Sequence, residues 1–259
     1  MKAADMFNLI GRVALVTGAS SGLGQQFARA LADNGAAVVL AARRTDRLLD
    51  LQQEIEAKGG KALAVEADVT DRAAMVAAFN AAEKAFGTVT ILVNNAGVAQ
   101  QSVRATDVTP EEWRRVLGVD LDAVFYWAQE GARRMIAAGK QGAIVNIASV
   151  LGFGVSKGTT AYAVAKAAVV QTTKALAVEL AFKGVRVNAI APGWFVTEIN
   201  DTYLESEAGL ALKRDIPMGR FGNAGDLDGA LLLLVSDAGA YMAGATIVVD
   251  GGQVVQIKG

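Results

Sequence analysis

The sequence predicts one α/β domain built on a doubly wound, seven-stranded parallel sheet with helices on both faces. Short runs that are apolar throughout alternate with longer helical runs, which is typical of parallel strands covered on both sides. The 259 residues are 53% hydrophobic, enough to fill one large core. No internal repeat, linker or low-complexity segment divides the chain, so we expect a single domain over residues 1–259.

The expected strands share an apolar run bounded by glycine or polar residues. They are Arg12–Thr17, Ala37–Ala41, Ala62–Val65, Thr90–Val93, Ala143–Ala148, Val185–Ile190 and Ala245–Val249. Right-handed crossovers through the intervening helices would place them in one sheet. The helices expected between them are Gly22–Asn34, Thr45–Lys58, Asp71–Phe86, Pro110–Ala138 and Thr160–Phe182.

The segment from Pro192 to about Asp226 is the one long stretch without a helical or strand pattern. A loop of this length in a compact domain is usually a lid or a binding loop. We therefore expect a loop over about 193–225 that covers a bound molecule.

The composition excludes several classes of site. The chain has no cysteine and no histidine, which excludes thiol nucleophiles, Ser-His-Asp hydrolysis and the usual zinc ligand sets, so no metal is expected. The net charge of −1 offers no basic surplus for a nucleic acid. No apolar run is long enough to span a membrane, and no signal-peptide pattern opens the chain, so we expect a cytoplasmic protein.

The segment Thr17–Gly24 reads T-G-A-S-S-G-L-G and joins the first strand to the first long helix. Its glycines remove side chains where the backbone turns tightly, and the free N–H groups of the helix N-terminus favour an anion. Such a turn alone can serve packing only. Its place after the first strand favours a dinucleotide phosphate site, although the spacing is not G-x-G-x-x-G.

Tyr162 and Lys166 are spaced to lie on one face of a helix. A nearby ammonium favours the phenolate form of a tyrosine and makes it a usable general acid and base. In isolation, the pair would more simply be a core tyrosine and a solvated lysine. Ser149 at the end of the fifth strand, where α/β sheets place their sites, favours chemistry.

At this point the chain closely resembles the short-chain dehydrogenases/reductases, a Rossmann-type family of about this length. The matching motifs span nearly the whole chain. They are T-G-x-x-x-G-x-G at Thr17–Gly24, N-N-A-G at Asn94–Gly97, the catalytic serine at Ser149, Y-x-x-x-K at Tyr162–Lys166, P-G-x-x-x-T from Pro192 to Thr197, and D-G-G at Asp250–Gly252.

The resemblance implies an NAD(P)-dependent oxidoreductase that transfers hydride between a carbonyl and a secondary alcohol. Tyr162 would be the general acid and base, Ser149 would bind the substrate oxygen, and Lys166 would also hold the nicotinamide ribose. Asn94 and Gly97 would line the cofactor channel. The cofactor-binding set implied by the motifs is Gly18, Ser20, Ser21, Gly22, Leu23, Gly24, Asp68, Val69, Asn95, Ala96, Gly97, Tyr162, Lys166, Pro192, Gly193 and Thr197.

Other functions stay open at this stage. A regulatory binding protein could keep the fold, but it would be expected to lose Ser149, Tyr162 or Lys166. An enoyl reductase of related fold would space the tyrosine and lysine differently, and an extended epimerase would usually be longer. A 3-oxoacyl-thioester reductase remains an alternative. Asp68 is equally well explained as an acid near the start of the next helix.

Three further expectations concern cofactor choice, proton relay and assembly. Ala42 stands where NAD-preferring relatives carry aspartate, and Arg43 could grip a 2′-phosphate, so we expect NADP(H) to be preferred and NAD(H) accepted. Asp120 replaces the asparagine that relatives usually carry, and we include it in the catalytic set because its charge could stabilise the Lys166 ammonium. The helix Thr160–Phe182 is apolar all round and predicts a homo-oligomer, which the resemblance makes a tetramer.

Overall fold

The computed structural model describes residues 2–196, 204 and 206–256. Seven parallel strands form one sheet in the order β3-β2-β1-β4-β5-β6-β7, which confirms the predicted doubly wound sheet. The strands are β1 Val13–Thr17, β2 Ala37–Ala42, β3 Lys61–Glu66, β4 Ile91–Asn94, β5 Gly142–Ile147, β6 Val185–Pro192 and β7 Thr246–Val249.

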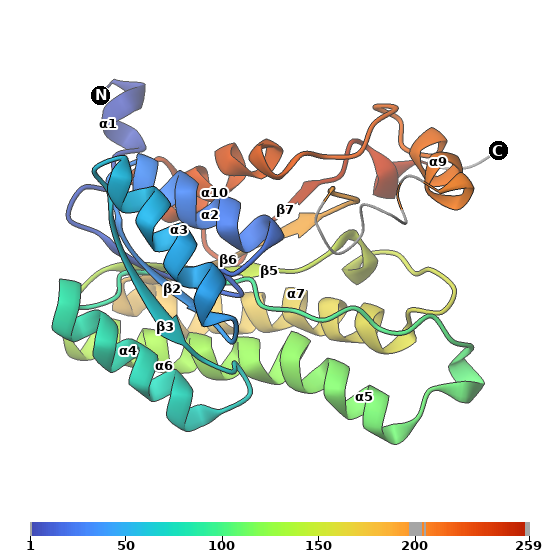
Figure 1. Cartoon of the computed structure of the whole chain (residues 1–259), viewed down its shortest axis with the longest axis horizontal. Helices are drawn as coiled ribbons and strands as arrows, with labels where there is room; N and C mark the ends of the chain where they lie inside the picture. Colours follow the sequence, from blue (N-terminus) through green and yellow to red (C-terminus); the bar gives the residue numbers. More distant parts are fainter. Residues whose placement is uncertain (1, 197–203, 205, 257–259) are drawn as a thin grey trace.

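Helices cover both faces of the sheet, as Figure 1 shows. On one face lie α2 (Gly22–Asp33), α3 (Thr45–Ala57) and α10 (Asp228–Val235). On the other lie α4 (Arg72–Phe86), α6 (Ala123–Ala137) and α7 (Thr160–Leu180). A short α1 (Ala3–Met6) precedes the sheet. None of the described helices combines the length and apolarity that a membrane crossing needs.

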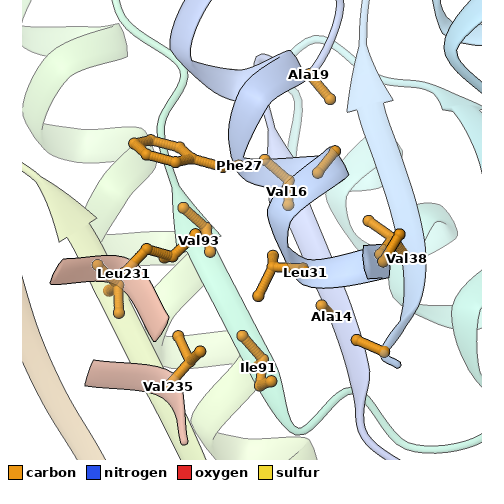
Figure 2. Packing of buried hydrophobic residues seen from close by; sticks show 14 of the residues in the cluster. Ala14, Val16, Ala19, Phe27, Leu31, Val38, Ile91, Val93, Leu231 and Val235 are labelled. Atoms are coloured by element: carbon orange, nitrogen blue, oxygen red, sulfur yellow. The ribbon is translucent and has the colours of Figure 1, made fainter. Parts of the chain in front are cut away.

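Two apolar cores hold the layers together, one on each face of the sheet. On the first face, Phe27 and Leu31 of α2 pack over β1 and β4 and meet Leu231 of α10 (Figure 2). On the second, Trp127 of α6 and Phe79 of α4 stack with ring centroids 5.7 Å apart. Burial of such apolar surface is the main stabilising term for the fold.

The expected Pro110–Ala138 helix is interrupted. It consists of α5 (Pro110–Leu117), a π-helical turn (Gly118–Asp122) and α6. Thr109 caps α5, accepting from the N–H of Glu112. The π turn adds a residue to one helical turn and re-aims the side chains in it, and Asp120 lies in this turn.

The long stretch after β6 is less irregular than the sequence suggested. It contains α9 (Glu207–Arg214), capped by Ser206, and a 3₁₀ turn at Ala224–Leu227 that leads into α10. Neither α9 nor α10 was predicted from the sequence. In α10 the reason is that apolar residues occupy most sides of the helix, so the sequence shows no alternation of apolar and polar residues with the helical period.

The strand order reverses beside β1, because the chain passes from β3 at one edge to β4 on the other side of β1. In open α/β sheets a crevice forms outside the carboxyl ends of the strands at this point. The ends of β1, β2, β4 and β5 therefore converge where the sequence predicted the site.

Candidate active site

The turn after β1 has the shape of a phosphate cradle. Gly18 and Gly22 adopt positive φ values of 67° and 55°, which favour glycine. Helix α2 begins at Gly22, and the Ser21 side chain makes no capping hydrogen bond. The first N–H groups of α2 are thus uncapped by Ser21 and face the crevice, so these residues fit the pyrophosphate of a dinucleotide.

Asn95, just after β4, fixes this turn from the neighbouring strand. Its side-chain amide donates to the carbonyl oxygens of Thr17 at 2.9 Å and Gly18 at 3.3 Å. The Thr17 hydroxyl in turn accepts from the N–H groups of Asn95 and Ala96. A Cβ on Gly24 would lie 2.5 Å from the Asn95 amide nitrogen, so the third glycine leaves room for this contact.

Asn94 does not line the cofactor channel, which corrects the expectation from the resemblance. It is 2% exposed, and its amide donates to Val124 O and to Asn146 Oδ1. Strand alternation explains the difference, since adjacent residues point to opposite sides of the backbone. Gly97 does border the catalytic end, because a Cβ there would lie 2.7 Å from Asp120 Oδ1.

Arg43 and Asp68 lie together at the ends of β2 and β3. Arg43 is 74% exposed in its side chain, and its Nη1 is 3.8 Å from Asp68 Oδ2. Hydrogen bonds from the Thr70 hydroxyl and N–H lower the pKa of Asp68, with Arg43 contributing less. Asp71, not Asp68, caps α4. The Val69 carbonyl accepts from the Trp127 indole at 3.0 Å.

Arg44 is a candidate that the sequence interpretation missed. Its guanidinium lies over the phosphate turn, donating to Ser20 Oγ at 3.1 and 3.2 Å and to Ser21 Oγ at 2.6 Å. A guanidinium held beside two hydroxyls at the end of β2 is suited to an anion. The pairing of two adjacent arginines at this strand end was the signal that could have indicated it.

Ser149 sits just past β5, at the start of a 3₁₀ turn (Val150–Gly152). It is 8% exposed, and its hydroxyl oxygen accepts from the N–H of Leu151 at 3.1 Å. The hydroxyl therefore keeps its own proton to donate. A Cβ on Gly152 would lie 2.9 Å from the Lys166 carbonyl oxygen, so this glycine lets the turn approach α7 closely.

The N-terminal half of α7 carries Tyr162 and Lys166. The Lys166 ammonium is 5.4 Å from the centroid of the Tyr162 ring and donates to Ile147 O at 3.1 Å. The backbone N–H of Tyr162, free within the first turn of the helix, donates to Gln100 Oε1 at 3.1 Å. The loop after β4 thereby holds the tyrosine end of α7 in place.

Asp120 forms a buried ion pair with Lys166. Its Oδ1 is 3.0 Å from Lys166 Nζ, and the two side chains are 0% and 4% exposed. Its other oxygen accepts from the N–H of Val98 at 3.2 Å. Burial acts to lower the pKa of Lys166, but the charges of Asp120 and Tyr162 and the bond to Asp120 outweigh it, so the pKa is raised. Lys166 is thus an ammonium.

The comparisons with known proteins agree with this geometry. A family model described as enoyl-(acyl carrier protein) reductase matches residues 18–253. Gluconate 5-dehydrogenase from Gluconobacter oxydans is 37% identical, with 98% of each chain covered. Galactitol 2-dehydrogenase (L-tagatose-forming) from Cereibacter sphaeroides is 41% identical, covering 96% of this chain and 98% of that protein.

A solved structure extends the likeness to three dimensions. Gluconate 5-dehydrogenase from Burkholderia cenocepacia, in complex with NADP and tartrate, has a TM-score of 0.93 at 37% identity, covering 99% of this chain and 100% of that one. This chain belongs to the short-chain dehydrogenases/reductases. It is an NAD(P)-dependent oxidoreductase that interconverts a carbonyl and a secondary alcohol.

The loop that such an enzyme would fold over its substrate is anchored at both ends. Phe195 is buried at 5% exposure and bridges to Gly222, which donates to Trp194 O at 2.9 Å. Behind it, Pro192 ends β6, and a Cβ on Gly193 would lie 2.7 Å from Asp250 Cβ. The Asp250 carboxylate accepts from the N–H groups of Gly252 and Val254. The D-G-G motif is thus a turn that supports this loop.

The expected cofactor residue Thr197 lies outside the described residues, as do Glu198, Ile199, Asp201, Tyr203 and Glu205 of the same loop.

Proposed function

We propose that Tyr162 is the general acid and base of the hydride transfer, with Ser149 and Lys166 as its catalytic partners. The observation that carries this proposal is the convergence of three side chains from two elements, the turn after β5 and helix α7. Ser149 follows β5, and the turn that holds it packs on the backbone of Lys166, whose ammonium lies beside the Tyr162 ring.

A bound nicotinamide cofactor would supply the hydride for carbonyl reduction or accept it in alcohol oxidation. During reduction the Tyr162 hydroxyl donates its proton to the carbonyl oxygen as the C–H bond forms, leaving a phenolate. The Ser149 hydroxyl donates a hydrogen bond to the same oxygen and stabilises the charge that develops on it. The Lys166 ammonium stabilises the phenolate, and alcohol oxidation reverses each transfer.

Replacing Tyr162 by phenylalanine tests this role, since only the hydroxyl is lost. Turnover should fall by about a thousandfold or more while NADP(H) still binds, because proton transfer is removed and the ring remains. Nicotinamide absorbance measures the first and intrinsic fluorescence titration the second. Tyr126→Phe, on α6, is the matched control. Retained turnover in Tyr162→Phe would remove Tyr162 from the mechanism.

NADP(H) is the preferred cofactor in this proposal, and NAD(H) is accepted less well. Arg43 and Arg44 supply two guanidinium groups at the end of β2, where Ala42 adds no repelling carboxylate. The Burkholderia relative, whose structure is described as a complex with NADP, supports the same choice.

Alanine at each arginine tests the preference. Arg43→Ala should lower the ratio of kcat/KM for NADP over NAD by about tenfold or more, the loss expected for a charged hydrogen bond. Arg44→Ala should lower it less, because hydrogen bonds to Ser20 and Ser21 hold Arg44 on the phosphate turn, whose pyrophosphate is common to both cofactors. Arg114→Ala on α5 should leave the ratio unchanged. An unchanged ratio in both β2-end variants would exclude the phosphate contact.

The substrate in this proposal is a polyhydroxy compound such as a sugar acid or an alditol. Relatives named for gluconate and galactitol cover almost the whole of this chain. A panel of gluconate, galactitol, simple ketones and 3-oxoacyl thioesters, followed by nicotinamide absorbance, discriminates the classes. A kcat/KM for the thioesters above that for every polyol or sugar acid would assign the alternative function, a 3-oxoacyl-thioester reductase.

We also propose that the chain assembles into a homo-oligomer, specifically a tetramer. One side of α7 faces the sheet, and α5 packs on part of another side. Val178 and Phe182 near its end are nonetheless 82% and 76% exposed in the single chain. Light scattering should give the mass of an oligomer, and Val178→Lys should reduce that mass. A monomeric wild type would contradict the proposed assembly.

The cytoplasmic location stays a prediction, which cell fractionation tests.

A further inference from the structure

The buried side chain beside Lys166 is a carboxylate in this chain. Asp120 is fully buried in the π turn, and its two oxygens are engaged by Lys166 and by the N–H of Val98. Gly97 completes the enclosure, because any larger residue would collide with Asp120 Oδ1. The carboxylate is therefore held in place on the buried side of the Lys166 ammonium.

The carboxylate changes the net charge that Tyr162 experiences. With asparagine, the group beside the tyrosine carries the full positive charge of Lys166. With Asp120, the ion pair is neutral overall, and the ammonium's stabilisation of a phenolate is partly cancelled. Burial makes this cancellation effective, since neither member of the pair is screened by solvent.

The geometry of the ammonium acts in the same direction. A lysine ammonium has three N–H donors. One donates to Ile147 O at 3.1 Å, and the Asp120 carboxylate lies 3.0 Å from the same nitrogen. A phenolate on Tyr162 would share the ammonium with this carbonyl and this carboxylate, so it receives less direct stabilisation.

The other charged groups around Tyr162 do not restore the positive field. Arg115 on α5 acts on Asp120 from a distance, but its guanidinium is paired with Glu112 at 2.7 Å. The loop after β4 and the 3₁₀ turn after β5 contribute the Gln100 amide and the Ser149 hydroxyl, which are uncharged. Arg104 and Lys157 on the adjoining loops are exposed. Within the described residues, Asp120 is the carboxylate that pairs with Lys166.

We infer that Asp120 is a positioning residue that keeps Tyr162 protonated near neutral pH, so that this enzyme is poised for carbonyl reduction and oxidises alcohols efficiently only at more alkaline pH. The inference rests on the proposed role of Tyr162. Reduction needs the neutral hydroxyl as a proton donor, whereas oxidation needs the phenolate as a proton acceptor. Removing the carboxylate should move the enzyme toward oxidation.

Direct titration of Tyr162 tests the inference without turnover. The chain has four tyrosines, so tyrosinate absorbance is followed against pH in the wild type and in Asp120→Asn, each minus its Tyr162→Phe counterpart. Asp120→Asn should lower the midpoint for Tyr162 by about one pH unit or more, since one buried charge is removed. An unchanged or raised midpoint would overturn the inference.

Kinetics in both directions supply the second readout. In Asp120→Asn the acidic limb of the pH–rate profile for alcohol oxidation should shift to lower pH by the same amount. The rate of oxidation near neutral pH should therefore rise by up to about tenfold. The alkaline limb of the pH–rate profile for carbonyl reduction should shift to lower pH as well. A uniform loss of rate, with both limbs in place, would mean that Asp120 serves only structure.

Two variants control the experiment. Asp122→Asn makes the same charge change two residues further on, where the side chain is exposed, and should leave both profiles in place. Asp120→Ser provides a second neutral replacement if the amide disturbs folding, and should move the midpoint in the same direction. Turnover retained in Tyr162→Phe would contradict the proposed function itself. If Tyr162→Phe is inactive but the pH–rate profiles of Asp120→Asn match those of the wild type, only this inference is wrong.

Discussion

The two ends of the site are held by different physics. The interior side of the phosphate turn is fixed by uncharged groups, namely the Asn95 amide, the Thr17 hydroxyl and glycines that let backbones touch, and Arg44 contacts the turn from outside. The proposed catalytic end contains the buried charges of Asp120 and Lys166. Neutral hydrogen bonds change little with pH, while a buried ion pair needs both partners charged.

This difference separates binding from chemistry. The shape of the turn should hardly respond to pH, because it is held by the backbone, Asn95 and Thr17, and by the Arg44 guanidinium, which stays protonated. The proton-transfer end should respond strongly to charge and only weakly to small changes of shape. Substitutions at each end can therefore test whether the division holds.

The largest effect is expected at the ion pair. Lys166→Met leaves the Asp120 carboxylate buried and unpaired, and should lower the free energy of unfolding by about 3–5 kcal/mol. Adding Asp120→Asn removes the second charge and should recover much of that loss, giving a large coupling energy in a double-mutant cycle. Urea unfolding at fixed protein concentration measures all four proteins. Additive losses would mean that the charges do not depend on one another.

A smaller effect is expected from shape at the phosphate turn. Gly24→Ala places a Cβ against the Asn95 amide and the Gly18 carbonyl, and should destabilise the fold by about 1–3 kcal/mol. NADP(H) affinity should fall as well, with no change in its pH dependence. Gly229→Ala on α10, where the added Cβ meets open space, is the control. Normal cofactor affinity in Gly24→Ala would show that the turn tolerates rearrangement.

The smallest effect concerns a surface pair in the nucleotide half. A hydrogen bond from Arg29 lowers the pKa of Glu54 to about 2 from 4.5, against burial and with help from Lys58. The pair should add stability above about pH 4.5 and lose it as pH falls toward about 2. Because both side chains are about a third exposed, the contribution is at most about 1 kcal/mol.

In Glu54→Gln the free energy of unfolding should therefore fall less steeply as the pH is lowered, as measured by urea unfolding at a series of pH values. Asp50→Asn on the same helix makes a matched charge change at an exposed position and should keep the wild-type slope. Equal slopes in the wild type and Glu54→Gln would show that the pair contributes nothing measurable.

Much of the fold and part of the site could be predicted from the sequence, because backbone patterns carry that information. The strands follow from their apolar runs, the phosphate turn from its glycines, and the shared helix face of Tyr162 and Lys166 from their spacing of four. The π turn did not, because an added residue leaves the helical pattern of Pro110–Ala138 almost unchanged.

Features that depend on the direction of a side chain could not be predicted from the sequence either. Asn94 and Asn95 are neighbours in one motif, yet only the structure separates the buried core contact of the first from the turn-holding role of the second. Arg44 is similar, since its position over Ser20 and Ser21 is a matter of rotamer.

The short run from Asn95 to Gly97 has a consequence for engineering. Asn95 holds the phosphate turn, and Gly97, two residues on, borders Asp120 and Lys166. If the proposed site is right, libraries that include this run should change nucleotide affinity and acid–base behaviour together. Arg43 lies at the end of β2, two strands from β4 and beside Asp68, and forms a more independent target. Cofactor exchange is best evolved there, with the 95–97 run kept constant.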